Sequence, residues 1–284
     1  MELTDHTIVP RNVSFGISKN AERHWFGGDL NCTAMMDCMS IFLPEGERFF
    51  ISSLKHYRQY IDDEEVLAAV KGYSVQEAFH TREHEDYNNS LRAFGYDVDG
   101  MEAPAKDWLR RPLMPVKKLA ATCAMEHLTM TYSLVTIRVP QLLEQAPAPY
   151  KRMWMWHAVE ELEHCTVALD VYRKVTKDWP AWKRYGLRVG AFSVVFFRIW
   201  QQHAKNMARY ARKDGVKTDW KYWLRVGHMT FIQPGFIRRG AGNLFRYFLP
   251  GYHPNPKHYG KELEIGRKWI GRELPELAED SIPA

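Results

Sequence analysis

Two Glu-x-x-His pairs constrain this chain more than any other feature. Glu77 and His80 form the first pair, and Glu161 and His164 form the second. On a helix, residues three apart lie about 60° from each other around the axis, so each pair presents both side chains on one face. Both pairs lie in stretches that are otherwise apolar or aromatic. Two such helices predict an all-α protein in which metal ligands point into the core of a helix bundle.

Two further glutamates complete the pattern. Glu47 lies in the helical stretch before the first pair, and Glu126 lies in the stretch between the two pairs. The order is then Glu, Glu-x-x-His, Glu, Glu-x-x-His, which is the ligand set of a ferritin-like four-helix bundle. Carboxylate oxygens bridge two divalent ions and neutralise their charge, while one imidazole per ion leaves a coordination position open. We expect two iron ions, with manganese as an alternative.

Neighbouring glutamates leave alternatives open. Glu45 lies close to Glu47 in the first turn after Pro44, where a glutamate can simply complement the helix dipole. Glu160 could replace Glu161, although only Glu161 has the i+3 spacing to the histidine that follows. Three other glutamates are expected to face solvent: Glu83, Glu85 and Glu163.

Two more histidines share the inward faces. His157 lies one turn before Glu161, and His84 lies one turn after His80. If the two helices run antiparallel, both histidines approach the same end of the site. We expect His157 to be a direct ligand. For His84 a hydrogen-bonding role is favoured over a ligand role to a third metal ion, and His127, about 100° from its neighbour Glu126, is expected to be structural.

Turn and cap residues predict helices almost throughout the chain. Asn31 is expected to cap the first helix, which Pro44 kinks or ends. Later helices are expected over 45–60, from a cap at Asp62 or Asp63 to 94, over 116–140, 149–175, 181–213 and 218–248, the last interrupted near 234 and 240. Residues 95–115 contain three prolines and are expected to form a loop.

Three regions follow from this pattern. Residues 1–28 form an irregular arm, residues 29–178 form the ferritin-like metal-binding bundle, and residues 179–284 form additional helices packed on it. The last region lacks any metal-ligand spacing. It is expected to be packing helices, an oligomer interface such as that of a homodimer, or a lid or peripheral membrane contact around Phe245, Tyr247, Phe248 and Leu249.

Composition excludes several classes of protein. The 284 residues carry a net charge of +5, with basic residues enriched from about 174 to 246. This excess suits an anionic substrate or a membrane surface, and it gives no specific support for nucleic-acid binding. Four scattered cysteines, no signal segment and no apolar run of about 18 residues lead us to expect a soluble cytoplasmic protein.

The ligand pattern resembles that of a known enzyme family. The set of Glu47, Glu77, His80, Glu126, His157, Glu161 and His164 looks like that of the p-aminobenzoate N-oxygenases, in which an additional histidine precedes the second Glu-x-x-His by four positions. The wider sequence, including Tyr-Phe-Leu-Pro-Gly-Tyr-His-Pro at 247–254, also resembles a bacterial family of predicted metal-dependent hydrolases. The first resemblance implies a di-iron, oxygen-activating site with three imidazoles, and His84 departs from that pattern.

Three functions remain in competition. We favour a non-haem di-iron oxidoreductase that activates dioxygen, takes electrons from an unidentified donor and oxidises a small organic substrate in an aromatic pocket, as in an N-oxygenase or a related monooxygenase. The first alternative is a two-metal hydrolase. The second alternative is a non-enzymatic, metal-binding relative of ferritin, for which the long aromatic C-terminal third has no evident use.

Overall fold

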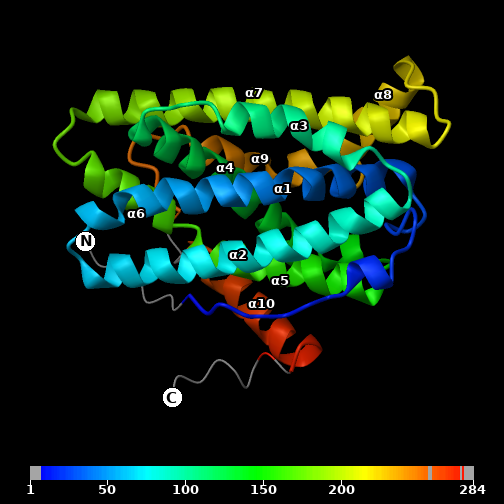
Figure 1. Ribbon diagram of the computed structural model, residues 1–284, viewed down its shortest axis with the longest axis horizontal. Helices are drawn as coiled ribbons and strands as arrows, with labels where there is room; N and C mark the ends of the chain where they lie inside the picture. Colours follow the sequence, from blue (N-terminus) through cyan, green and yellow to red (C-terminus); the bar gives the residue numbers. More distant parts are fainter. Residues whose placement is uncertain (1–7, 255–257, 276, 278–284) are drawn as a thin grey trace.

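The computed structural model describes residues 8–254, 258–275 and 277, and every regular element in that part of the chain is helical. Four long helices form a bundle (Figure 1): α1 (Leu30–Tyr57), α2 (Glu64–Ala93), α4 (Pro115–Arg138) and α5 (Ala148–His164). Helix α1 packs on α2 and α4, and α5 packs on α4 and α2. The prediction of an all-α fold consistent with a ferritin-like bundle is therefore confirmed.

Side-chain caps and prolines set the helix starts. Asp29, not Asn31, caps α1 through a hydrogen bond from Cys32 N, and Asp63 caps α2 through one from Val66 N. These bonds satisfy amide groups that the first turn of a helix leaves without partners. Helix α4 begins at Pro115, a position where the missing N–H costs nothing.

Two prolines lie inside helices without ending them. Pro44 cannot donate to the carbonyl of Ser40, and Asn88 Nδ2 donates to that carbonyl instead at 3.1 Å. Pro104 likewise leaves the carbonyl of Gly100 free, and an Arg209 nitrogen donates to it at 2.6 Å. The separate helix predicted to start after Pro44 is therefore wrong: α1 continues through Pro44 to Tyr57, because a neighbouring side chain satisfies the freed carbonyl.

Two of the predicted element boundaries are wrong. The expected loop over 95–115 contains helix α3 (Val98–Leu109), which Asp97 caps by accepting from Gly100 N at 3.0 Å. The expected single helix over 149–175 is divided at Cys165 and Thr166 into α5 and α6 (Val167–Val175). Three short 3-10 helices, η1 (Ile17–Lys19), η2 (Arg58–Tyr60) and η3 (Pro140–Leu143), complete the first part of the chain.

The C-terminal region packs its helices on the outside of the bundle. The long α7 (Ala181–Lys213) runs beside α1 and α4, followed by α8 (Trp220–Phe231) and α9 (Phe236–Arg246), while α10 (Gly260–Glu273) crosses the far side of α5 (Figure 1). Helix α10 approaches α5 closely at Gly266, where a Cβ would lie 2.5 Å from Val159 Cγ2. Residues 1–7 of the predicted arm and 278–284 of the predicted C-terminal region lie outside the described residues.

The surface proposed for membrane contact is only partly exposed. Phe245 and Leu249 are 71% and 55% exposed, whereas Tyr247 is buried at 1%. Tyr247 was therefore wrongly assigned to that surface, because its ring packs against Phe192 and His127. Within the described residues, none of the helices combines the length and apolarity needed to cross a bilayer.

Candidate metal centre

The carboxylate of Glu77 lies between two imidazoles. Helices α2 and α5 present their Glu-x-x-His pairs toward each other, and Glu77, His80 and His164 are fully buried. Oε1 of Glu77 lies 3.3 Å from His164 Nε2, and Oε2 lies 3.8 Å from His80 Nδ1. Each oxygen therefore faces a different histidine, as a carboxylate that bridges two metal ions would.

One oxygen of Glu161 faces three imidazoles. Oε1 lies 3.2 Å from His157 Nε2 and 3.8 Å from both His80 Nδ1 and His164 Nε2. The other oxygen, Oε2, accepts a hydrogen bond from the Thr129 hydroxyl at 2.5 Å. That bond fixes the carboxylate so that Oε1 points into the centre of the cluster.

The other two predicted glutamates approach the same cluster from α1 and α4. Glu126 Oε2 lies 3.3 Å from His164 Nδ1, while its Oε1 accepts from the Tyr73 hydroxyl at 2.5 Å. Two sets of residues each bring one ligand atom apiece to within 4.8 Å of one another: Glu77, His80, Glu161 and His164 form one set, and Glu47, His84 and His157 form the other. All eight residues named from the sequence are therefore buried and inward-facing, with Glu126 beside the first set rather than within it.

The cluster leaves many buried polar atoms without hydrogen bonds. Nine such atoms belong to the predicted ligands: both oxygens of Glu47 and Glu77, Glu126 Oε2, Glu161 Oε1, His80 Nδ1, and both ring nitrogens of His164. Buried polar atoms are normally paired, and a buried carboxylate without a partner is costly. Because the carboxylate oxygens and one ring nitrogen of each neutral histidine can donate lone pairs to a cation, the residues present fit divalent metal ions.

The protonation behaviour reflects this crowding of charge. Burial and the nearby Glu77 raise the pKa of Glu47 well above its usual value. For Glu161 burial acts upward, but the neighbouring His164 outweighs it and lowers the pKa to about 2. For His164 burial acts downward, but Glu161 and Glu126 outweigh it and raise the pKa to about 9. Without added positive charge, the carboxylates depend on imidazolium or on bound protons.

A chain of hydrogen bonds fixes which nitrogen of His157 carries its proton. The carbonyl of Ser40 can only accept, so the Asn88 amide turns its nitrogen to it and its oxygen to the Ser40 hydroxyl, 3.0 Å away. Because the Ser40 hydroxyl donates its only proton to Asn88, it must accept a hydrogen bond from His84 Nδ1, 2.9 Å away. His84 Nε2 is then an acceptor, and His157 Nδ1 donates to it at 3.1 Å.

These hydrogen bonds leave the lone pair of His157 Nε2 directed at Glu161 and the cluster. Burial lowers the pKa of His84 well below its usual value and that of His157 to about 4, so both rings are neutral near pH 7. His84 is inward-facing as predicted, and both of its nitrogens are engaged in hydrogen bonds. Pro44 was the one feature of the sequence that could have pointed to this hydrogen-bond chain, because a proline at that position leaves the carbonyl of Ser40 without its helical donor. Ligand spacing alone does not point to Ser40 or Asn88.

The N-terminal arm supports the other side of the cluster. Arg11, 8% exposed, donates to Glu160 Oε1 at 3.1 Å and to both oxygens of Glu163 at 2.8 and 2.9 Å. Glu160 in turn lies 3.1 Å from His80 Nε2, which leaves Nδ1 of that ring facing the centre. Glu160 thus orients His80 rather than replacing Glu161. No local spacing identifies Arg11, because its position depends on the path of an irregular segment.

Two of the glutamates predicted to face solvent are buried. Glu163 is covered by Arg11 and by Arg267 of α10, whose Nε donates to it at 2.9 Å. Glu83 accepts from the backbone amide of Phe15, at 2.9 Å, because the arm passes over α2. Glu85 is exposed as predicted, and the Tyr252 hydroxyl lies 2.8 Å from His127 Nδ1.

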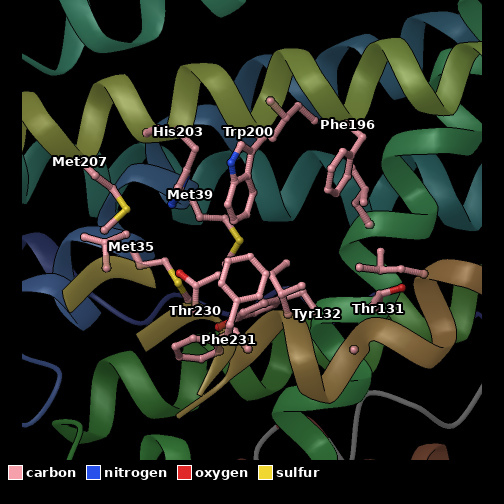
Figure 2. Close-up of a pocket in the computed structure, with 18 of the residues that line it drawn as sticks. Met35, Met39, Thr131, Tyr132, Phe196, Trp200, His203, Met207, Thr230 and Phe231 are labelled. Atoms are coloured by element: carbon pink, nitrogen blue, oxygen red, sulfur yellow. The ribbon is translucent and has the colours of Figure 1, made fainter. Parts of the chain in front are cut away.

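An aromatic pocket lies behind α4 rather than at the cluster. It has a volume of about 320 Å³ and is bounded by α7, α8 and α9 against α1 and α4. Figure 2 shows Met35, Met39, Phe196 and Trp200 pointing into it. The pocket is lined by none of the candidate ligands. The expected aromatic pocket therefore exists, but the wall formed by α1 and α4 separates it from the glutamates on their other faces.

Comparison with known families identifies the chain. The family model described as predicted metal-dependent hydrolase matches residues 9–258. The chain belongs to this family. The match spans all four bundle helices and α6 to α9, so every candidate ligand lies within it. Searches of curated proteins and of solved structures returned no match.

Proposed function

We propose that the chain is a two-metal hydrolase that acts on a small molecule. The observation that carries the proposal is the set of nine buried oxygen and nitrogen atoms without hydrogen bonds that converge from α1, α2, α4 and α5. The family description supports metal-dependent hydrolysis. The residues proposed to hold the ions are Glu47, Glu77, His80, Glu126, His157, Glu161 and His164, with His84 hydrogen-bonded behind them.

The protein's own contribution is to hold these ligands in fixed positions. Glu77 and Glu161 face more than one histidine each and are suited to lie between the ions. Glu160 and the His84 chain orient His80 and His157, respectively. Divalent ions at such a site supply Lewis acidity and lower the pKa of bound water toward neutrality.

A second candidate is dioxygen-dependent oxidation of a small organic substrate. One specific observation favours it: His157 Nε2 lies 3.2 Å from Glu161 and its ring stacks on His80 at 4.2 Å, as the resemblance to the N-oxygenases implies for a third imidazole. Redox-active iron would supply electrons to dioxygen at such a site, with a separate donor required to return them.

The two candidates differ in whether the reaction needs dioxygen and electrons. Purified protein loaded anaerobically with manganese, zinc or ferrous iron is assayed against a panel of carboxylic esters, amides and phosphate esters, and then for dioxygen consumption. Turnover without dioxygen, lost in Glu161→Gln, is expected for the hydrolase. No hydrolysis of any compound in the panel, together with dioxygen consumption by the reduced iron form, would reject the hydrolase proposal and favour dioxygen-dependent oxidation. Metal binding with neither activity contradicts both and leaves a non-catalytic metal-binding role.

A further inference from the structure

A second cleft, lined by basic side chains, lies at the α6 end of the bundle, opposite the end that carries α8 (Figure 1). Its volume is about 720 Å³, and it lies between α6, the start of α7 and residues 250–252. Five cationic side chains line it: Arg173, Lys174, Lys177, Arg184 and Arg188. The two acidic side chains in its lining already have partners, since Asp63 lies 3.5 Å from Lys174 and Asp170 lies 2.7 Å from His253.

Arg188 is the decisive residue of this cleft. It is 5% exposed, and its guanidinium donates to two backbone carbonyls, those of Tyr247 and Leu249. Its Cζ lies 4.6 Å from the ring centre of Tyr247 and 5.6 Å from that of Tyr252. Among the described residues, no carboxylate pairs with it. A buried cation normally has an anionic partner, so this one is suited to an anion that comes from outside the chain.

The other arginines of the cleft reinforce this excess of positive charge. Arg173 donates to the carbonyls of Gly251 and Tyr252, and Arg184 makes no ion pair within the described part of the chain. Burial, together with the charges of Arg188 and Arg184, lowers the pKa of Arg173 despite the opposing effect of Asp170. Three guanidinium groups therefore face one cavity, and guanidinium binds carboxylate and phosphate with two parallel hydrogen bonds.

A small second cavity shares lining residues with this cleft and with the metal centre. Leu169 and Tyr252 line both, and the small cavity is also lined by Glu126. Its volume of about 10 Å³ has room for about one water-sized group. Three of its lining groups have a buried atom without a hydrogen-bond partner: Glu126 Oε2, His127 Nε2 and the Tyr247 hydroxyl.

We infer that the basic cleft binds the anionic group of the substrate, a small molecule that carries a carboxylate or a phosphate, on the side of the bundle where Leu169 and Tyr252 also line the cavity beside Glu126. This inference rests on the proposed function for its use, but anion binding in the cleft does not require metal. The two can therefore be tested separately on one set of samples.

The test is calorimetric titration of the full-length protein after removal of metal with a chelator. The probes are inorganic phosphate and benzoate, with benzyl alcohol as the neutral counterpart of benzoate. Arg184→Gln and Arg188→Gln remove cleft charges, and Lys205→Gln removes an exposed charge from the same helix α7 outside the cleft. Thermal unfolding of each variant identifies any that fails to fold, and because Arg184 is only half-buried, its variant keeps the test decisive if Arg188→Gln is unstable.

At least one anion is expected to bind the wild type, benzyl alcohol is not, and Arg184→Gln is expected to weaken anion binding about tenfold or more. Binding of only phosphate or only benzoate identifies which group the substrate carries. The inference is overturned if neither anion binds, or if Lys205→Gln weakens anion binding as much as Arg184→Gln does. Metal content measured on the same preparations keeps the failures apart: anion binding by a protein that takes up no metal would refute the proposed function alone.

Discussion

At the scale of single residues, the orientation of His157 depends on a side chain that never reaches the cluster. Asn88 satisfies the carbonyl freed by Pro44, and through Ser40 and His84 it determines that His157 presents Nε2. Loss of the amide would allow the Ser40 hydroxyl to donate to His84, which reverses the polarity of the chain. Groups behind metal ligands commonly affect affinity in this way.

We therefore predict that Asn88→Ala weakens metal binding by roughly 10- to 100-fold. The matched control is Asn89→Ala, which alters an exposed neighbour on the same helix. Metal titration gives the affinities, and nitrogen NMR of the histidine rings in the zinc-loaded protein should show a proton on Nδ1 of His157 in the wild type. Equal metal affinities for the two variants would show that the hydrogen bonds from Asn88 to His84 do not control how His157 binds metal.

The glutamate ligands carry a cost in the metal-free protein. Burial, and the nearby Glu161 and Glu126, raise the pKa of Glu77 well above its usual value despite the opposing charge of His164. Removal of a buried charge that lacks hydrogen bonds should stabilise the metal-free fold.

Glu77→Gln is accordingly predicted to raise the unfolding free energy of the metal-free protein by about 1–4 kcal/mol while it reduces metal binding. Glu83→Gln, on the same helix, should instead lower it, because Glu83 accepts from Phe15 N and from Arg82. Urea unfolding in the presence of a chelator compares the two. A destabilised Glu77→Gln variant would mean that this carboxylate has partners other than metal.

At the scale of elements, features that depend on residues close in sequence could be predicted, whereas contacts made by the connecting segments could not. The Glu-x-x-His pairs could be assigned because residues three apart on one helix share a face whatever the tertiary structure. Helix α3 was missed because Pro104 is tolerated only through Arg209, which is distant in sequence. Glu163 was assigned to solvent for the same reason, since Arg11 and Arg267 come from segments remote from α5.

The arm should behave as an integral part of the bundle. We predict that Arg11→Met destabilises the protein by about 3–5 kcal/mol, because it leaves Glu160 and Glu163 buried with fewer partners. Arg23→Met, in the same arm, removes a pair whose arginine side chain is 46% exposed and should cost about 0–1 kcal/mol. Denaturant titrations of both variants give the comparison. A similar small effect for the two would show that the arm only rests on the surface.

At the scale of the whole molecule, the pH dependence of stability follows from the same cluster. His164 has a pKa of about 9 in the folded protein, where Glu161 and Glu126 outweigh the effect of burial, against about 6.5 when unfolded. A base with a raised folded pKa gives stability that is complete below about pH 6.5 and lost as the pH rises through about 9. Glu47 and Glu77 act in the same direction, because raised carboxyl pKa values favour the protonated folded state.

The metal-free protein is therefore predicted to lose stability between pH 6.5 and 9, by on the order of 3 kcal/mol from His164. His84 and His157 act in the opposite direction, but only near the lower end of this range, because well above about pH 6.5 they are neutral in both the folded and the unfolded state. Calorimetric melting of chelator-treated protein measures the effect, and His164→Gln should flatten it. A melting temperature that rises over this interval would contradict the assignment of charges.

The central claim is tested most directly by counting metal ions per chain. Protein purified anaerobically and reconstituted with ferrous iron, manganese or zinc is analysed by elemental mass spectrometry, alongside Glu161→Gln, His80→Ala and the control Glu83→Gln. About two ions are expected in the wild type and in Glu83→Gln, and a loss of at least one in each of the other two variants. Full occupancy in Glu161→Gln and His80→Ala, or no bound metal in the wild type under any of these conditions, would contradict it.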